Sequence, residues 1–215
     1  MREKICFVFG AGEHYAAPAP APGSGDFVIA ADGGYKYLAA SNIPVHLLIG
    51  DFDSLETIPE TIQTIKLSPE KDYTDTTEAL QAGWERGYRL FHIYGGTGGR
   101  LDHTLANIQC LADLAERGGR GLLFDKETVI TAIHNDTIFF PAGAEGALSV
   151  FSHSDTAAGV YERGLKYSLT DALLRNTSTI GLSNEFTGAP ASIAVREGTL
   201  IIVYPRSCNA GFSEL

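Results

Sequence analysis

The sequence predicts an α/β fold: a parallel sheet flanked by helices in the first part of the chain, followed by a smaller all-β domain. Up to about residue 125, short apolar runs alternate with helical patterns, which is typical of parallel sheets whose strands are connected by helices. Beyond that residue the runs are short and rich in β-branched or aromatic residues, with turn residues between them. A length of 215 residues allows one core or two small ones, and the change of pattern leads us to expect two domains, residues 1–125 and residues 126–215.

The elements of the first domain follow from hydrophobic spacing. Short apolar runs have the length of buried strands. The helix predicted over residues 105–117 places Leu105, Ile108 and Leu111 on one face, which can cover the sheet. The other predicted helices are residues 35–40 and 76–86, and the predicted strands are residues 6–9, 27–31, 47–49, 64–67, 90–94 and 122–124.

The second domain has no comparable helical pattern after Arg117. Residues 134–136 and 196–198 have the composition of hairpin connections. Several short strands joined by turns are typical of a β-sandwich, and we expect the second domain to be one. Its predicted strands are residues 129–133, 137–140, 148–151, 160–162, 192–195 and 200–204.

Composition indicates a folded cytoplasmic protein. Apolar residues make up 44% of the chain, and no segment approaches the roughly 18 apolar residues that span a bilayer. The apolar run at residues 5–9 is too short for a secretory leader. Cys6, Cys110 and Cys208 lack the spacing of a zinc site and fit a reducing compartment. The formal charge of −10 disfavours nucleic acid and anionic membranes as partners, so an anionic substrate needs a local positive centre.

Acidic residues follow several predicted parallel strands, at the sheet edge where α/β proteins generally bind ligands. Asp51 and Asp53 come directly after the third strand, and their spacing in extended chain places both carboxylates on one side. Two such charges about 4 Å apart repel by about 4 kcal/mol at an effective dielectric of about 20, so a shared cation would stabilise them. Together with Asp75 they predict an oxygen-only site that favours Mg²⁺. An Asx turn or a helix cap is the alternative for a single such pair.

A glycine-rich segment, residues 95–99, follows a predicted strand and precedes a helix. Its glycines let backbone N–H groups approach phosphate oxygens, and Arg100 supplies a planar fork suited to phosphate. A flexible connection is the alternative. The segment is neither a Walker A motif nor a GxGxxG fingerprint, which argues against P-loop and nicotinamide-binding proteins. Asp102 is either a helix cap or a group that orients a ligand or takes part in catalysis.

Residues 71–75 form the loop before the predicted helix 76–86. Threonine and acids at this place are what ordinary helix capping predicts. Lys71 and Asp72 lie just before the helix, so they can face the same strand-end cleft. Lys71 can then help to neutralise a nucleotide phosphate.

Five short motifs follow one another along the chain. They are Ala31-Asp32-Gly33-Gly34, Gly50-Asp51-Phe52-Asp53-Ser54, Asp72-Tyr73-Thr74-Asp75, Gly99-Arg100-Leu101-Asp102-His103 and Ser178-Thr179-Ile180-Gly181-Leu182-Ser183-Asn184-Glu185-Phe186. Each motif is weak by itself. In this order they resemble the bacterial type of the thiamine pyrophosphokinase family, and the resemblance covers nearly the whole chain.

The resemblance implies a Rossmann-like N-terminal domain, a β-sandwich C-terminal domain and a homodimer that binds thiamine where its subunits meet. It also implies a reaction in which ATP, bound with Mg²⁺, gives its pyrophosphoryl group to the hydroxyl of thiamine. Thiamine diphosphate and AMP would be the products. The N-terminal domain would bind ATP and Mg²⁺, and the C-terminal domain would bind thiamine and form the dimer.

The resemblance also assigns roles to residues by matching position. The metal ligands would be Asp51, Asp53 and Asp75. The thiamine-binding residues would be Ser178, Ser183 and Asn184. The catalytic residues would be Asp53, Arg100 and Asp102, with Asp102 orienting or deprotonating the thiamine hydroxyl. ATP would be bound by Asp32, Gly33, Gly34, Lys71, Asp72, Thr74, Gly96, Thr97, Gly98, Gly99 and Arg100.

One departure from the family pattern and two alternative functions remain. Some family members place a tryptophan beside thiamine, but the single tryptophan here, Trp84, lies in a predicted helix of the first domain. Phe186 can take that place or be a buried core residue.

A magnesium-dependent phosphohydrolase or sugar-nucleotide transferase would use Asp51 and Asp53 but leaves residues 178–186 unexplained. A non-catalytic nucleotide-sensing module would bind ATP without releasing AMP.

Overall fold

The computed structural model describes residues 2–15, 20–53, 61–68, 70, 72–208 and 210–212. Contacts within the chain divide it into two compact units. The first comprises Met1–Asn107 with Leu123–Asp125, and the second comprises Ile108–Leu122 with Lys126–Leu215. The division therefore falls within helix α3 (Leu101–Glu116) and within strand β6 (Arg120–Phe124).

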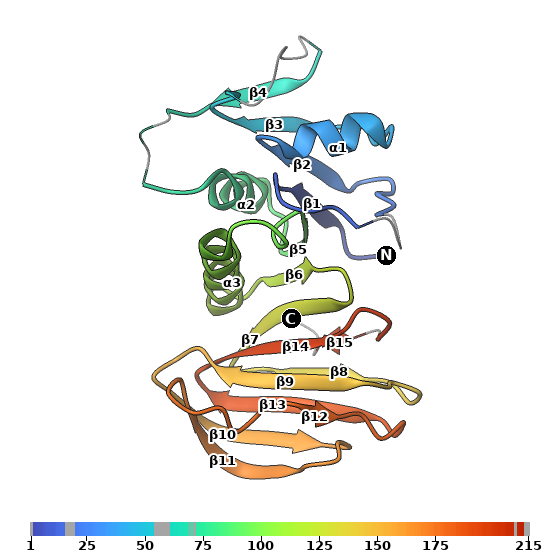
Figure 1. The fold of residues 1–215 in the computed structure, drawn as a ribbon, viewed down its shortest axis with the longest axis vertical. Helices are drawn as coiled ribbons and strands as arrows, with labels where there is room; N and C mark the ends of the chain where they lie inside the picture. The colour runs from blue at the N-terminus through green and yellow to red at the C-terminus, as the bar shows by residue number, and fades with distance from the viewer. Residues whose placement is uncertain are drawn as a thin grey trace. The chain divides into compact units, whose positions relative to one another are not determined.

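The first unit is built on a parallel sheet (Figure 1). Its strands lie in the order β4-β3-β2-β1-β5, and each neighbouring pair is parallel. Strands β1 and β2, with the apolar sequences ICFVF and FVIAA, are buried along nearly their whole length, as parallel strands covered on both faces are. The strands are β1 (Ile5–Phe9), β2 (Phe27–Ala31), β3 (Leu47–Gly50), β4 (Gln63–Lys66) and β5 (Leu90–Tyr94).

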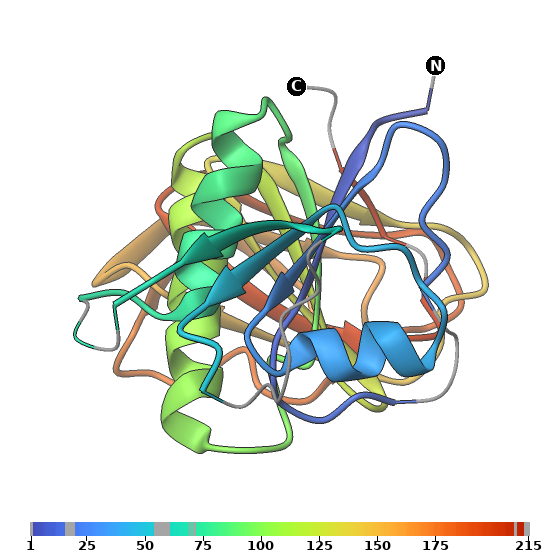
Figure 2. The same ribbon diagram turned by 90° about the horizontal axis from the view of Figure 1, so that it is seen from above.

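Helices α1 (Gly34–Ala40) and α2 (Asp75–Glu85) cover opposite faces of this sheet (Figure 2). Side chains along a strand alternate between its two faces. Phe7 of β1 belongs to a buried cluster with Leu38 of α1, whereas a Cβ at Gly83 of α2 would lie 2.7 Å from the sulfur of Cys6. The absence of a side chain at Gly83 thus lets α2 approach β1. None of the helices in the described part of the chain is long and apolar enough to cross a membrane.

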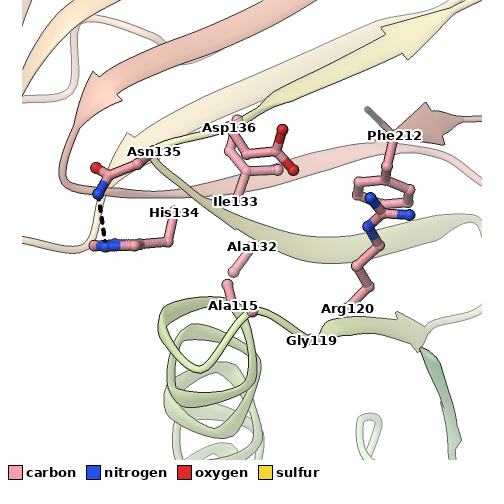
Figure 3. Close-up of a pocket in the computed structure, with 10 residues that line it drawn as sticks. Ala115, Gly119, Arg120, Ala132, Ile133, His134, Asn135, Asp136 and Phe212 are labelled. Carbon is pink, nitrogen blue, oxygen red and sulfur yellow. Dashed lines mark hydrogen bonds between the residues drawn. The ribbon is translucent and has the colours of Figure 1, made fainter. Parts of the chain in front are cut away.

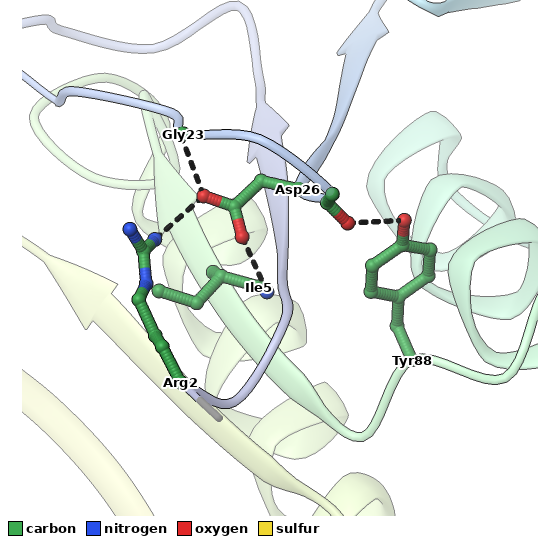
Figure 4. Close-up of polar contacts among 6 residues, drawn as sticks. Arg2, Ile5, Gly23, Asp26 and Tyr88 are labelled. Atoms are coloured by element: carbon green, nitrogen blue, oxygen red, sulfur yellow. Dashed lines mark hydrogen bonds and ion pairs between the residues drawn. The ribbon is translucent and has the colours of Figure 1, made fainter.

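A buried carboxylate fastens the start of β2 to the start of β1 (Figure 4). The side chain of Asp26 is 2% exposed and accepts the backbone N–H groups of Ile5 at 2.9 Å and Gly23 at 2.8 Å. It also pairs with the Arg2 guanidinium at 2.6 Å, and the Tyr88 hydroxyl donates to a neighbouring backbone carbonyl at 3.0 Å. Burial raises the pKa of Asp26, but these N–H donors and Arg2 outweigh burial and lower it. The carboxylate is therefore stabilised in its charged form.

The second unit contains two antiparallel sheets. Their strand orders are β12-β9-β14-β7 and β11-β10-β13-β8-β15. Phe140 in β8 packs edge to face against Phe186, with 4.9 Å between the ring centroids, and against Tyr204 in β14, with 5.1 Å between the centroids. Aromatic side chains therefore join the two sheets. The strands are β7 (Thr128–His134), β8 (Thr137–Phe140), β9 (Ala147–Ser152), β10 (Thr156–Arg163), β11 (Leu169–Arg175), β12 (Asn184–Glu185), β13 (Ala191–Glu197), β14 (Thr199–Pro205) and β15 (Gly211–Phe212).

The expectation of a mixed α/β protein with a parallel sheet first and antiparallel strands after it is confirmed. Each strand and helix predicted from hydrophobic spacing overlaps an observed element. Helix α3 begins earlier than predicted, at Leu101, because its first turn has no apolar face that the spacing could reveal. Strand β11 was missed because Leu174 is its one fully buried residue, so no alternation is visible. Strands β12 and β15 have two residues each and are too short to leave a pattern.

Candidate functional site

Three carboxylates meet where β2 and β3 end. These strands are parallel neighbours with Ala31 opposite Ile49, so the residues that follow them lie at the same edge of the sheet. Asp32, Asp51 and Asp53 each offer one carboxylate oxygen, and these oxygens all lie within 4.8 Å of one another. Asp32 and Asp51 are partly buried, whereas Asp53 is exposed. Oxygen-only donors of this kind fit a hard cation such as Mg²⁺.

Phe52 determines how Asp51 and Asp53 come together. It has a φ of 65°, is 6% exposed and packs in the same cluster as Phe9 and Leu38. The left-handed conformation costs a residue with a side chain roughly 1–2 kcal/mol, which burial of the ring offsets. Asp51 Oδ1 accepts the N–H of Asp53 at 3.2 Å, as in an Asx turn. The sequence predicted this pair on one side of an extended chain, but a tight turn with a buried ring brings it together.

The structure groups Asp32, and not Asp75, with Asp51 and Asp53 among the described residues. Asp75 is the first residue of α2 and follows Thr74, whose hydroxyl caps the helix by accepting the N–H of Thr77 at 3.2 Å. A carboxylate in a first helical turn interacts favourably with the helix dipole. Asp75 as a metal ligand therefore stays a prediction, while Asp32 moves from the expected phosphate-binding set to the carboxylate group.

The glycine-rich segment after β5 is held by the residues that follow β1. Gly12 donates its N–H to the carbonyl of Gly95 at 2.8 Å, and Glu13 donates to that of Thr97 at 3.0 Å. A Cβ at Gly12 would lie 2.6 Å from both carbonyl oxygens, so a larger residue would not fit. Gly10-Ala11-Gly12 lacks the third glycine of a dinucleotide-binding fingerprint, and no role was predicted for it. A glycine pair directly after the first strand was the signal for this role.

Two buried side chains also fix the glycine-rich segment. Asn107 of α3 donates to the carbonyl of Gly96 at 2.8 Å, and the Thr97 hydroxyl donates to Asp125 at 2.6 Å. Asn107 and Thr97 are each 5% exposed. Because the Thr97 hydroxyl is used internally, its predicted contact with ATP would come from the backbone. Asn107 and Asp125 were not predicted, although a polar residue on the inner face of a predicted helix was a signal for Asn107.

The other residues predicted to bind ATP have varied surroundings. A Cβ at Gly34 would collide with the carbonyl oxygen of Phe9, and Gly98 has a φ of 79°, so both positions favour glycine. Gly33 precedes α1 as its N-cap, while Asp72 and Gly99 are exposed. Lys71 lies outside the described residues, as does Ser54 of the second motif.

Arg100 and Asp102 form a bidentate pair at the start of α3. Arg100 Nη2 lies 2.6 Å from Asp102 Oδ2, and Nε lies 3.1 Å from Oδ1. Their side chains are 72% and 64% exposed. The hydrogen bonds and charge of Asp102 raise the pKa of Arg100, and the hydrogen bond from Arg100 lowers the pKa of Asp102. The guanidinium fork thus holds a carboxylate that a phosphate would have to replace.

In the second unit, Asn184 is saturated by internal hydrogen bonds. Its Nδ2 donates to Glu162 Oε2 and to the carbonyl of Tyr167, both at 2.7 Å. Its Oδ1 accepts the N–H groups of Tyr167 at 3.0 Å and Glu185 at 2.9 Å. These four bonds use both donors and both acceptor positions of the amide, which is 4% exposed. The predicted contact of this side chain with thiamine would therefore break one of them.

Ser178 and Ser183 lie on an exposed loop of the second unit. Ser178 donates its N–H to a backbone carbonyl at 3.0 Å, and Ser183 donates its own to Ser149 Oγ at 3.1 Å. Ser183 has a φ of 58°, in the left-handed region. Ile180 and Leu182, between the two serines, are also exposed. The loop thus presents hydroxyl and apolar groups together at the surface.

Tyr167 is an exposed aromatic residue next to Asn184. Its side chain is exposed, while both of its backbone polar groups are bonded to the Asn184 amide. Phe186, the aromatic candidate from the sequence, is buried against Phe140. Trp84 lies in α2 of the first unit, with the Arg89 guanidinium 3.8 Å above its ring. Tyr167 was not among the residues predicted from the sequence.

A pocket of about 180 Å³ in the second unit contains none of the predicted residues (Figure 3). His134 in its wall lies 2.9 Å from both Thr199 Oγ1 and Asn135 Nδ2. Arg120 lies over the ring of Phe212, with 4.9 Å between the guanidinium carbon and the ring centroid. Because His134 and Arg120 already have partners within the chain, the pocket is weaker as a ligand site than the carboxylate group.

Comparisons with known proteins match both parts of the chain to domains of the same family. The thiamin pyrophosphokinase catalytic domain matches residues 23–120, and the thiamin pyrophosphokinase vitamin B1 binding domain matches residues 136–200. A thiamine pyrophosphokinase of Bacillus subtilis is 31% identical over 181 residues, which are 77% of this chain and 80% of that protein. The crystal structure of thiamine pyrophosphokinase from Bacillus subtilis has a TM-score of 0.83 and 24% identity, covering 95% of this chain and 100% of that one. That of thiamin pyrophosphokinase from Geobacillus thermodenitrificans has a TM-score of 0.82 and 26% identity, with the same coverage of 95% and 100%.

Proposed function

The chain belongs to the thiamine pyrophosphokinase family, and we propose that it transfers the pyrophosphoryl group of ATP to the hydroxyl of thiamine, giving thiamine diphosphate and AMP. The observation that carries this proposal is the group of Asp32, Asp51 and Asp53 at the ends of two parallel strands. The group lies in the part of the chain that matches the catalytic domain, residues 23–120. The match over residues 136–200 includes Ser178, Ser183 and Asn184.

We propose that Asp32, Asp51 and Asp53 hold Mg²⁺. Their carboxylate oxygens lie within 4.8 Å of one another, and an all-oxygen donor set suits this cation. Bound Mg²⁺ would supply positive charge for the phosphates of ATP and for the reacting centre. Asp75 is the alternative third ligand. Loss of Mg²⁺ binding in Asp32→Asn but not in Asp75→Asn would favour the observed group.

Arg100 and Asp102 are proposed to act in sequence on the two substrates. The guanidinium of Arg100 binds both carboxylate oxygens of Asp102, and a phosphate of ATP would bind the same two guanidinium N–H groups. When Arg100 turns to a phosphate of ATP, the pKa of Asp102 returns toward its ordinary value because the bond that lowers it is lost. The released carboxylate then orients the thiamine hydroxyl and accepts its proton. The glycine-rich segment and Lys71 would complete the phosphate site.

The proposed division of labour follows the two domains predicted from the sequence. The α/β domain, residues 1–125, has a Rossmann-like arrangement and binds ATP with Mg²⁺. Its parallel sheet, covered by α1 and α2, supports this assignment. The domain of residues 126–215 is a β-sandwich that binds thiamine, supported by its two antiparallel sheets and by the matched vitamin B1 binding domain.

Thiamine is proposed to bind the exposed surface formed by Ser178, Ser183 and Tyr167. The serine hydroxyls would meet its polar groups, and the face of the Tyr167 ring would attract the cationic thiazolium ring. The exposure of Tyr167, 59%, and its bonds to Asn184 support this role. Asn184 would then act behind the surface and not in direct contact.

We also propose that the protein is a cytoplasmic homodimer. Cys6, Cys110 and Cys208 form no disulfide, as expected in a reducing compartment. Exposed apolar side chains on the second unit, such as Ile180 and Leu182, are candidates for the contact between subunits. Light scattering coupled to size-exclusion chromatography will measure the mass, and a monomer at micromolar concentration would contradict the dimer.

The reaction is tested by measuring AMP and thiamine diphosphate formed from ATP and Mg²⁺, with and without thiamine. We expect thiamine-dependent AMP from the wild-type protein and its loss in Asp53→Ala. Asp113→Ala removes an exposed acid of α3 outside the carboxylate group and serves as the control. Phosphate release without thiamine would indicate a phosphohydrolase. ATP binding without turnover would indicate a nucleotide-sensing module.

A further inference from the structure

We propose that Glu162 is a positioning residue for thiamine: it completes the hydrogen bonding of the Asn184 amide, which fixes Tyr167 and Ser183 at the surface. The inference rests on the proposed function, because it concerns the surface assigned there to thiamine. Neither the sequence motifs nor the family resemblance gives Glu162 a role.

Glu162 joins the two sheets of the second unit. It lies in β10 between Leu169 of β11 and Ile193 of β13, and it is 1% exposed. Asn184 lies in β12, paired with Leu148 of β9 in the other sheet. The 2.7 Å bond from Asn184 Nδ2 to Glu162 Oε2 therefore spans from one sheet to the other. Burial raises the pKa of Glu162, an effect that the bond from Asn184 partly opposes.

The carboxyl group helps to decide which way the Asn184 amide points. A carboxyl oxygen accepts a hydrogen bond whether the group is ionised or neutral, so it faces Nδ2 in both states. Oδ1 is then directed to the N–H groups of Tyr167 and Glu185. Without an acceptor at position 162, one N–H of a 4% exposed amide loses its partner. We expect the amide to shift or to loosen its bonds to Tyr167.

Two exposed groups depend on this amide. Tyr167 is bonded to Asn184 through both its backbone N–H and its carbonyl, so the start of its side chain is fixed although the ring is exposed. Ser183 directly precedes Asn184 and has a φ of 58°, a conformation that serine rarely adopts. An anchored neighbour keeps Ser183 in that conformation. The buried carboxyl thus acts on both sides of the proposed thiamine surface.

Glu162 is poorly suited to a purely stabilising role. Its Oε1 is buried without a hydrogen-bond partner among the residues that the structure describes. Burying an incompletely bonded carboxyl opposes folding, and an apolar side chain of similar volume at such a position is often neutral or stabilising. A positioning role therefore predicts that stability and thiamine binding respond differently to Glu162→Leu.

The test compares Glu162→Leu with Glu162→Gln, whose amide oxygen can still accept the bond from Asn184. In Glu162→Leu we expect the KM for thiamine to rise about tenfold, equivalent to about 1.4 kcal/mol. The KM for ATP and the thermal midpoint should stay at or near the wild-type values. Hydrogen exchange of the Tyr167 and Glu185 amides should become faster. Glu162→Gln should restore the wild-type KM for thiamine and the slower exchange of these amides.

Each other outcome is decisive. A wild-type KM for thiamine and unchanged exchange in Glu162→Leu would overturn the proposal. Failure of this variant to fold, or an equal rise of both KM values without rescue by Glu162→Gln, would assign Glu162 a structural role. If the wild-type protein forms no thiamine-dependent AMP, the proposed function fails, and exchange at Tyr167 and Glu185 still decides whether Glu162 positions this segment.

Discussion

The carboxylate group of the first unit and the Glu162–Asn184 pair of the second are both clusters of polar side chains, but they are built differently. Asp32, Asp51 and Asp53 place three like charges within 4.8 Å at the ends of strands, with Asp53 exposed. Asn184 is buried, and each of its four hydrogen-bonding positions has a partner within the protein.

The two clusters therefore differ in what stabilises them. Neighbouring carboxylates repel, so the first cluster gains stability from a cation that comes from outside. The second cluster takes its hydrogen-bond partners from the chain itself, so removing a member leaves a buried group of Asn184 without its partner and disturbs the neighbours that Asn184 holds. We therefore expect substitutions in the first cluster to lower activity without lowering stability. Substitutions of internally bonded groups should change stability or the geometry of their neighbours.

The largest effect is expected for Asp51→Asn. The asparagine oxygen can still accept the N–H of Asp53, so the turn around Phe52 should persist. Activity should fall by roughly 10²–10³-fold because Mg²⁺ loses a charged ligand. The free energy of unfolding without Mg²⁺ should stay constant or rise by up to about 1 kcal/mol as repulsion decreases. AMP formation and chemical denaturation measure the two quantities.

If Mg²⁺ stabilises the carboxylate group, added Mg²⁺ should stabilise Asp51→Asn less than it stabilises the wild-type protein. A ligand at about 100 times its dissociation constant stabilises a protein by about 2.7 kcal/mol, so thermal unfolding with and without Mg²⁺ can detect its loss. Asp113→Asn, an exposed acid outside the group, should respond to Mg²⁺ as the wild type does. Unchanged stabilisation in Asp51→Asn would remove Asp51 from the metal site.

A smaller effect is expected for Arg100→Lys. Lysine keeps the charge but lacks the planar fork that engages two oxygens at once, as Arg100 engages Asp102. We expect kcat to fall by roughly tenfold to a hundredfold while stability stays constant, because the pair is exposed. Arg117→Lys changes another arginine, paired with Asp113, and should keep full activity. Equal losses in both variants would argue against a phosphate contact at Arg100.

Asp26→Asn tests why the two clusters should respond differently to substitution. The cause is either that one cluster has its partners within the protein or merely that the clusters lie in different units. Asp26 belongs to the first unit, yet its carboxylate accepts two N–H groups and pairs with Arg2. We expect the variant to unfold about 1–3 kcal/mol more easily at pH 7. Activity per folded molecule should be unchanged. Denaturation followed by circular dichroism gives the free energy.

The pH dependence of Asp26 has a defined sign. Its pKa is lower in the folded state than in the unfolded chain, so its contribution is fully present above the ordinary aspartate pKa of about 4. That contribution is lost as pH falls from there through the lower folded-state pKa. The difference in stability between wild type and Asp26→Asn should therefore shrink below about pH 4. A constant difference down to pH 2 would show that the charge of Asp26 is not the stabilising feature.

Much of the fold could be predicted because burial leaves a pattern of apolar residues in the sequence. The buried parallel strands β1, β2 and β3 appear as continuous apolar runs, and the long helices appear as apolar residues at helical spacing. Strand β11, at a sheet edge, shows neither pattern because Leu174 is its one fully buried residue. Asp51 and Asp53 were predictable as a pair from their spacing. Their association with Asp32 depends on β2 and β3 being neighbours, which spacing along the chain does not encode.

Glu162 and Asn184 show why the second cluster was harder to predict. Val160 and Glu162 share one face of β10, and both are buried, so the alternation does place the glutamate inward. A glutamate is normally exposed, and its partner Asn184 is 22 residues away in the chain. Asn184 was predicted to contact thiamine because a motif records which residues matter and not which atoms are already bonded.

The smallest effect is expected at Tyr167, where the two kinds of cluster meet. Tyr167→Ala removes an exposed ring but keeps the backbone groups that bond Asn184, so stability should change little. The KM for thiamine should rise about tenfold, within the range of a lost contact between a cation and an aromatic ring, and Tyr167→Phe should bind nearly as well as the wild type. Phe139→Ala, which removes another exposed ring of this unit, is the control. An unchanged KM in Tyr167→Ala would leave the positioning of Ser183 as the route by which Asn184 acts on thiamine.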